Sequence, residues 1–168
     1  MRIKQVLFFL SVFSWVSFAS AVEPMKITSP DIRPGDYMER KFTCQGMNVP
    51  PRLEFIDVPD NARSLAVMVH DPDASSGDWV HWVIFNIPPD EREIGAVMTP
   101  GIEGVNDFGK EGWGGPCPPF GTHRYVFNAY ALDSMLDLTK AATRSEFYKA
   151  VAGHILAQAE LIGLYEKI

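Results

Sequence analysis

Three short apolar runs, each bounded by proline, glycine or acidic residues, most strongly limit what this chain can fold into. Each run is only seven or eight residues long and is rich in β-branched and aromatic side chains. Runs of that length and composition are typical of buried strands and too short for most helices. The runs cover residues 64–70, 81–87 and 125–132. We therefore predict a β-rich fold in which these three strands are central.

Weaker patterns on the N-terminal side add two strand candidates. Residues 53–56 lie between Pro50-Pro51 and Pro59, and prolines of this kind commonly bound a strand. Residues 37–44 alternate weakly between apolar and polar side chains, as a half-buried strand does.

The period of the apolar residues changes near the C-terminus. Thr143 and Glu146 have the spacing of a capping box, which marks a helix start. An apolar stripe at helical spacing follows, formed by Phe147, Val151, Ile155 and Ala159. We predict one helix from about Ser145 to Leu161, packed on the sheets. The expected fold is an antiparallel two-sheet β-sandwich closed by a C-terminal α-helix.

The N-terminus has the pattern of a secretory signal peptide. Arg2 and Lys4 precede an apolar run from Val6 to Phe18, and Ala19-Ser20-Ala21 supplies small residues for cleavage. The run is shorter than the roughly 20 residues that a membrane span needs. We predict that residues 1–21 are removed near Ala21, which leaves one domain, 22–168, with no integral membrane segment. The mature protein would be exported, to the periplasm or outside the cell.

The charge of the chain restricts its partners. The formal net charge is −6, and loss of a signal peptide with two basic residues would make it −8. A surface this acidic disfavours binding to nucleic acid or to anionic membrane. A phosphate-like ligand must therefore be held by directed donors inside a pocket.

The chain has two cysteines, Cys44 and Cys117. An even pair in an exported chain predicts a disulfide, and the alternative is two buried thiols. No cysteine or histidine spacing matches a structural zinc motif.

The segment Asp71-Pro72-Asp73 directly follows one of the predicted central strands. Pro72 keeps Asp71 out of the helical region, so that its carboxylate is presented from the end of a rigid element. An ordinary turn in which both carboxylates cap backbone N–H groups is the alternative. A calcium loop is excluded, because Ser76 and Trp82 stand where glycine and glutamate are required.

Two histidines, His81 and His123, lie at the starts of the other two central strands, beside the glycine-rich segment 100–121. Loops of this length in a compact domain are commonly functional. A carboxylate beside an imidazole favours its protonated form, and protonated histidine with loop N–H groups would bind a phosphate or a carboxylate. This hypothesis predicts that affinity falls as the pH rises through the histidine pKa.

Two alternatives use the same residues. Asp71, His81 and His123 could form a two-histidine, one-carboxylate metal site, although no spacing requires it. Cys117 with His123 could serve as nucleophile and base of a hydrolase, provided that Cys117 is a free thiol. We favour neither, and expect no metal, no cofactor and no catalytic residues.

Taken together, these motifs resemble those of the phosphatidylethanolamine-binding protein family, in its bacterial, kinase-inhibitor-like branch. The resemblance covers nearly all of the chain after the signal peptide. The segments that carry it are Phe42–Asn48, Asp71–Ala74, Trp79–Trp82, Asn106–Gly109, Gly114–Pro119, His123–Tyr125 and Gly153–Leu161.

The resemblance implies a β-sandwich-like fold with a small pocket for phosphate, phosphorylethanolamine or similar anions. The pocket residues that it implies are Asp71, Trp79, His81, the Gly115 and Pro116 backbone, His123 and Tyr125. Tyr165 matches a C-terminal pocket tyrosine only loosely. Two departures concern the pocket rim: Ser75 stands where the family commonly has proline, and the stretch between Pro119 and His123 is short.

Members of this family are mostly binding or inhibitory proteins that regulate kinases or proteases, which makes an enzyme the less favoured class. We therefore expect an exported protein that binds a small anion and has a regulatory or inhibitory role. The alternative is an inhibitor of a kinase or protease that has no physiological small ligand.

Overall fold

The computed structural model describes residues 24–95 and 99–167. The predicted signal peptide, residues 1–21, lies outside the described residues. The elements are β1 (Lys26–Thr28), the short 3-10 helix η1 (Arg40–Phe42), β2 (Leu53–Ile56), β3 (Ser64–Asp71), β4 (Trp79–Ile87), β5 (Glu93–Ile94), β6 (Ile102–Glu103), β7 (Thr122–Leu132), α1 (Arg144–Val151) and β8 (Ile155–Glu166).

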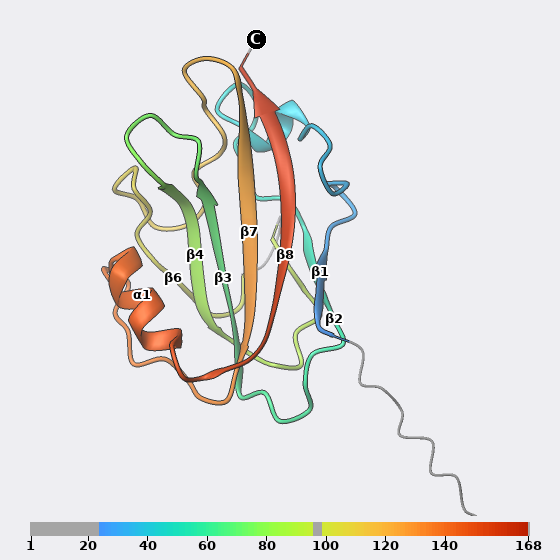
Figure 1. The fold of residues 1–168 in the computed structure, drawn as a ribbon, viewed down its shortest axis with the longest axis vertical. Helices are drawn as coiled ribbons and strands as arrows, with labels where there is room; N and C mark the ends of the chain where they lie inside the picture. Colours follow the sequence, from blue (N-terminus) through green and yellow to red (C-terminus); the bar gives the residue numbers. More distant parts are fainter. Residues whose placement is uncertain (1–23, 96–98, 168) are drawn as a thin grey trace, which may run out of the picture.

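The strands form two antiparallel sheets that pack face to face (Figure 1). The small sheet has the order β1-β2-β5, and the large sheet has the order β6-β4-β3-β7-β8. The predicted β-rich, two-sheet antiparallel fold with one helix in the C-terminal part is confirmed. No helix within residues 24–95 and 99–167 is long and apolar enough to cross a membrane.

The strand β3 is central because both of its faces are covered. Leu65, Val67 and Val69 point into the core between the two sheets. Ala66 and Met68 point the other way, into a second core that includes Phe147 and Val151 of α1. A strand buried on both faces needs a continuous apolar run, and for this reason the strand can be predicted from the sequence. In Figure 1, α1 lies beside β4 and β6, on the side of the large sheet away from β1 and β2.

The predicted helix over Ser145–Leu161 is wrong in its second half. The capping box is present, since the Thr143 hydroxyl accepts from Glu146 N and the Glu146 carboxylate accepts from Thr143 N. The helix nevertheless ends at Val151, and Gly153 follows with a φ of +84°, a backbone conformation that suits glycine.

Residues Ile155–Glu166 instead form β8, the longest strand, which pairs with β7 along its length. Its buried residues alternate as Leu161, Gly163 and Tyr165, with the period of two that a strand requires. The helical spacing of Ile155 and Ala159 was therefore coincidental. Pairing along β7 outweighs the local helical pattern.

The predicted strand over residues 37–44 is also wrong. Tyr37 makes one isolated parallel bridge to Leu164 of β8, and the chain then turns into η1. This path buries Met38 and Phe42 in the core between the sheets. Among the other candidates, residues 53–56, 64–70, 81–87 and 125–132 are confirmed as parts of β2, β3, β4 and β7.

The register of β8 makes a prediction that separates strand from helix. Leu161 is buried between the sheets, whereas Ile155 is 40% exposed. Leu161→Ala should therefore lower the free energy of unfolding by about 2–4 kcal/mol, and Ile155→Ala by less than about 1 kcal/mol. Urea denaturation of the two variants measures this, and equal losses would contradict the register.

Candidate functional site

The antiparallel pairing of β3 with both β4 and β7 collects the predicted site residues at one end of the large sheet. Asp71 is the last residue of β3, Trp79 and His81 lie at the start of β4, and His123 and Tyr125 lie at the start of β7. Because β3 runs antiparallel to its two neighbours, the C-terminal end of β3 and the N-terminal ends of β4 and β7 meet (Figure 1).

A cavity of about 200 Å³ opens at this end of the sheet. Four of the predicted residues contribute to its wall: Asp71, Trp79, His81 and His123. The remaining lining residues come from the loops around it: Ala74, Ser75, Ser76, Phe108, Cys117, Pro118 and Pro119.

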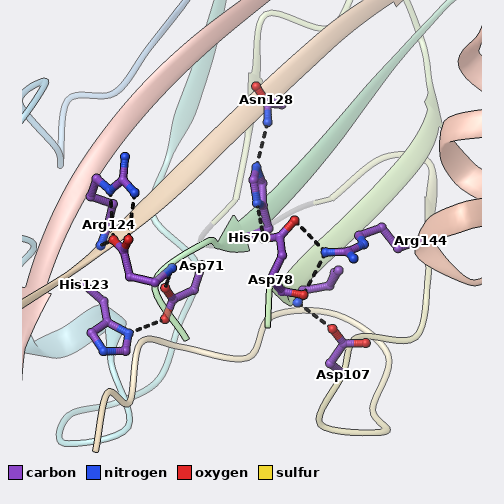
Figure 2. Close-up of polar contacts among 10 residues, drawn as sticks. His70, Asp71, Asp78, Asp107, His123, Arg124, Asn128 and Arg144 are labelled. Atoms are coloured by element: carbon purple, nitrogen blue, oxygen red, sulfur yellow. Dashed lines mark hydrogen bonds and ion pairs between the residues drawn. The ribbon is translucent and has the colours of Figure 1, made fainter. Parts of the chain in front are cut away.

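Asp71 and His123 form a buried hydrogen-bonded pair, which Figure 2 shows facing one another. His123 Nδ1 lies 2.7 Å from Asp71 Oδ2. The other carboxylate oxygen, Oδ1, accepts from Asp73 N at 2.9 Å. Since an ionised carboxylate only accepts, Nδ1 carries the proton and Nε2 is left for the cavity. The pair therefore fixes the ring orientation and the tautomer of His123.

His81 is also held through Nδ1, but by a backbone carbonyl. Its Nδ1 donates to Gly114 O at 2.5 Å, and the residue is only 3% exposed. Burial lowers the pKa of His81, and this effect outweighs the opposing influence of the Gly114 hydrogen bond and of the Asp71 and Asp107 charges. Of the two histidines that the sequence analysis considered for anion binding, His81 is thus the one whose surroundings favour the neutral form.

Two aromatic residues of the predicted site have polar atoms without partners. Trp79 Nε1 and Tyr125 Oη are buried, and neither makes a hydrogen bond within the part of the chain that the structure describes. Tyr125 packs edge-on against His81, with ring centroids 5.1 Å apart. Burial, and then the nearby Asp71 charge, raise the pKa of Tyr125, so that it stays a neutral phenol. Tyr125 lies behind the cavity wall and is not part of the lining.

Gly115 and Pro116 also lie outside the lining, and they secure the loop that carries Cys117. Gly115 N donates to Asn48 Oδ1 at 2.8 Å, and Pro116 O accepts from Cys44 N at 3.1 Å. Proline has no N–H, so this dipeptide directs no backbone donor at the cavity. Its part in the geometry is to dock residues 113–117 on residues 42–48.

The predicted disulfide between Cys44 and Cys117 is confirmed, with Cα atoms 5.4 Å apart. It covalently joins the two docked loops, and Cys117 itself lines the cavity. A bonded cysteine has no thiolate, so the nucleophile of the proposed Cys117–His123 hydrolase is absent in this state.

The loop from Pro72 to Asp78 is clamped at both ends by charged contacts, which Figure 2 shows. Asp73 and Arg124 of β7 form a two-pronged ion pair, with Nε at 2.9 Å and Nη2 at 2.7 Å. This pair lowers the pKa of Asp73 to about 2. At the other end, Asp78 contacts Arg144 of α1 and His70 Nδ1, each at 2.5 Å. Ser75 and Ser76 lie between the two clamps, at the cavity.

A third loop, around Asn106 and Asp107, is held in place by side chains whose structural role was not predicted from the sequence. Asp107 accepts from Val80 N at 2.7 Å. The Asn106 side chain accepts from the backbone N–H groups of Phe108 and Lys110 and donates to Gly112 O. These contacts place Phe108 edge-on to His81, with ring centroids 5.3 Å apart. The Asn106–Gly109 segment contributes to the family resemblance, but the sequence alone does not reveal that its side chains hold this loop in place.

The alternative of a metal site receives no support from the geometry. The Nδ1 atoms of both imidazoles are already engaged, His123 with Asp71 Oδ2 and His81 with Gly114 O, and the other Asp71 oxygen accepts from Asp73 N. No group of three or more metal-ligating side chains is found among residues 24–95 and 99–167.

Tyr165 lies outside the first cavity. It is the cross-strand neighbour of His123, and its hydroxyl donates to Gln45 Oε1 at 2.6 Å. It lines a separate cavity of about 420 Å³ with Tyr37, Met38, Arg40, Gln45 and Glu166.

Comparison with known proteins agrees with this fold. The model of the family "Phosphatidylethanolamine-binding protein" matches residues 28–166. A UPF0098 protein of Methanothermobacter thermautotrophicus is 46% identical over 134 residues, which cover 76% of this chain and 89% of the relative. A UPF0098 protein of Chlamydia trachomatis is 40% identical over 150 residues, covering 85% and 99%.

Two crystal structures are similar over most of the chain. A phosphatidylethanolamine-binding protein homologue from Chlamydia trachomatis superposes with a TM-score of 0.83 at 38% identity, covering 86% of this chain and 99% of that one. E. coli YbcL, a member of the mammalian PEBP family, superposes with a TM-score of 0.80 at 29% identity, covering 87% and 100%. This chain therefore belongs to the phosphatidylethanolamine-binding protein family.

The buried neutral imidazole makes stability depend on pH. An unfolded histidine takes up a proton near pH 6.5, whereas the lowered pKa of His81 resists protonation in the folded state. The free energy of unfolding should therefore fall as the pH is lowered through and below 6.5. His81→Gln should make this fall less steep in urea denaturation at pH 7.5, 6.5 and 5.5. An unchanged slope would show that His81 does not contribute.

Proposed function

We propose that this protein is an exported binding protein for a small anion, of the phosphate or phosphorylethanolamine type, with a regulatory or inhibitory role. The observation that carries the proposal is the buried Asp71–His123 pair in the cavity wall, with Nε2 of His123 left for a ligand. When protonated, His123 presents Nε2–H to an anion while the Asp71 carboxylate balances its charge.

The size and the surroundings of the cavity support a small ligand. At about 200 Å³, the cavity is below the usual range of roughly 300–1,000 Å³ for drug-sized ligands. Ser75 and Ser76 add hydroxyl donors to the same wall as His123. A phosphate group fits this space, and the acyl chains of a lipid do not.

Export is supported by the Cys44–Cys117 disulfide, since disulfides persist mainly in oxidising compartments. The regulatory role rests on family membership. In this proposal the target is another protein, such as a kinase or a protease. Binding or release of the anion would change the protein surface around the cavity, and with it the affinity for the target.

Removal of His123 tests anion binding directly. His123→Ala should weaken phosphorylethanolamine binding about tenfold or more, because a charge-assisted hydrogen bond contributes about 1.5–3 kcal/mol. The measurement is an amide NMR titration near pH 6, which follows residues around Asp71, His81 and His123.

His154→Ala is the matched control. His154 is an exposed imidazole that also contacts a carboxylate, that of Asp133, but it lies outside the cavity lining. It should leave the affinity unchanged. Equal affinity of the wild type and His123→Ala, or no saturable shifts at millimolar ligand, would rule the proposal out.

An inhibitor without a physiological small ligand is the second candidate, and the cavity rim favours it. Phe120 is 71% exposed and directly follows Pro119 of the lining, and Phe108 is 43% exposed in the lining itself. Exposed aromatic side chains are costly unless covered, and they are common energetic anchors of protein interfaces.

The two functions separate in a binding experiment with immobilised protein and cell extract. Phe120→Ser should abolish capture of a specific partner. Met135→Ser, which removes another exposed apolar side chain outside the cavity lining, should not. A partner that His123→Ala still captures, and that phosphate does not displace, would support the inhibitor. A partner lost with His123→Ala would favour anion-dependent regulation.

A further inference from the structure

The two imidazoles of the cavity are held in the same way, each through its Nδ1. Each has its Nδ1 occupied, His123 by the Asp71 carboxylate and His81 by the Gly114 carbonyl. Both acceptors are oxygens with lone pairs only, so both Nδ1 atoms carry hydrogen and Nε2 is the atom left for a ligand. Both residues line the cavity, and neither Nε2 makes a hydrogen bond to any residue that the structure describes.

The surroundings of His81 keep its Nε2 an acceptor. The charged groups that act on the ring are Asp71 and Asp107, which favour a proton, and His70, which opposes one. Burial outweighs the two carboxylates, and Phe108 and Tyr125 pack edge-on against the ring. A neutral imidazole with hydrogen on Nδ1 has a lone pair on Nε2.

His81 lines the cavity, so a ligand that filled it without a donor would bury the Nε2 lone pair unpaired, which is costly. A ligand with a donor as well as a negative charge avoids this cost. Each oxygen of Asp71 already accepts one hydrogen bond, whereas Nε2 of His81 accepts none from the residues that the structure describes, so His81 is the unpaired acceptor in the wall. In the proposed complex, Nε2–H of His123, when that ring is protonated, meets the negative oxygen, and Nε2 of His81 accepts the ligand's hydrogen.

We infer that His81 makes this cavity selective for oxyanions that still carry an acidic proton, namely phosphate and phosphomonoesters, over sulfate and phosphodiesters. The inference rests on the proposed anion-binding function and narrows its ligand class. Inorganic phosphate keeps at least one O–H throughout the neutral range, and a phosphomonoester keeps one below its second pKa of about 6. Sulfate and a dialkyl phosphodiester have none.

The test compares inorganic phosphate with sulfate by calorimetric titration of the disulfide-bonded protein at pH 6 and constant ionic strength. The two ions have the same shape, and sulfate carries the larger charge, so simple attraction would favour sulfate. We expect phosphate to bind about tenfold or more tightly, which is the effect of one unpaired buried acceptor. Methyl phosphate should likewise bind more tightly than dimethyl phosphate.

The variant that tests the residue is His81→Gln, whose side-chain amide can turn to donate or to accept. The readout is the ratio of the two affinities, since the absolute affinities also reflect changes in the cavity wall. The phosphate-to-sulfate ratio should fall toward one in His81→Gln and stay unchanged in His154→Gln, an exposed imidazole outside the cavity lining.

A second measurement needs no variant. The ¹⁵N resonance of His81 Nε2 in the wild type should shift on addition of phosphate, as an acceptor that gains a hydrogen bond does, and sulfate should leave it in place.

The outcomes are distinct. Binding of phosphate and sulfate with equal affinity overturns the selectivity but leaves anion binding intact, and binding of neither overturns the proposed function itself. His81 does not determine the selectivity if the phosphate-to-sulfate affinity ratio is unchanged in a folded His81→Gln variant. The same follows if the Nε2 resonance of His81 does not shift on addition of phosphate.

Discussion

The position of β3 between β4 and β7 is the constraint on which the rest of the structure depends. Each of the three strands carries site residues at one end, and antiparallel pairing brings those ends together. Asp71 and His123, 52 residues apart in sequence, meet only because this pairing is in register. The two cores on either face of β3 stabilise the pairing. The geometry of the site at this end of the large sheet therefore depends on apolar contacts some distance away.

Three loops around this end of the large sheet form the rest of the cavity, and each is held in place by a different kind of interaction. Ion pairs with Arg124 and Arg144 hold the loop after β3. Side-chain contacts to backbone groups shape the loop around Asn106, and a disulfide joins the loop of Cys117 to residues 42–48. The proposed anion site is compatible with an acidic chain because its donors would act locally, while the net charge of −6 is spread over the whole surface.

Much of the fold could be predicted because the decisive strands are buried. The runs at β3, β4 and β7 are apolar enough to be recognised without their neighbours. The strand β8 could not be recognised, because Ile155 and Ala159 also fit a helix and only pairing with β7 decides between them. The segment around Tyr37 was misjudged for a related reason, since its buried residues cover the end of β8 instead of forming a ladder.

The site was predictable to a similar degree. Asp71, His81 and His123 could be predicted because acid and imidazole groups stand next to recognisable strands, and Trp79 was implied by the family resemblance. The difference between the two histidines was hidden, since it depends on the Gly114 carbonyl that contacts His81 and on the burial of the ring. Ser76 and Phe108 were not predicted as lining residues, because loop side chains become neighbours of a cavity only after the loops have been fixed in place.

The close docking at Gly115 has a consequence for how sequences of this kind can vary. A side chain at this position would collide with the Asn48 amide oxygen and with the backbone of Phe42 and Thr43, which face it across the disulfide-joined loops. Ser75, in contrast, borders open space in the cavity and can be exchanged without disturbing a neighbour's backbone. Among chains that share this architecture, a glycine that touches no ligand would thus be a more dependable marker of the cavity than the residues that line it.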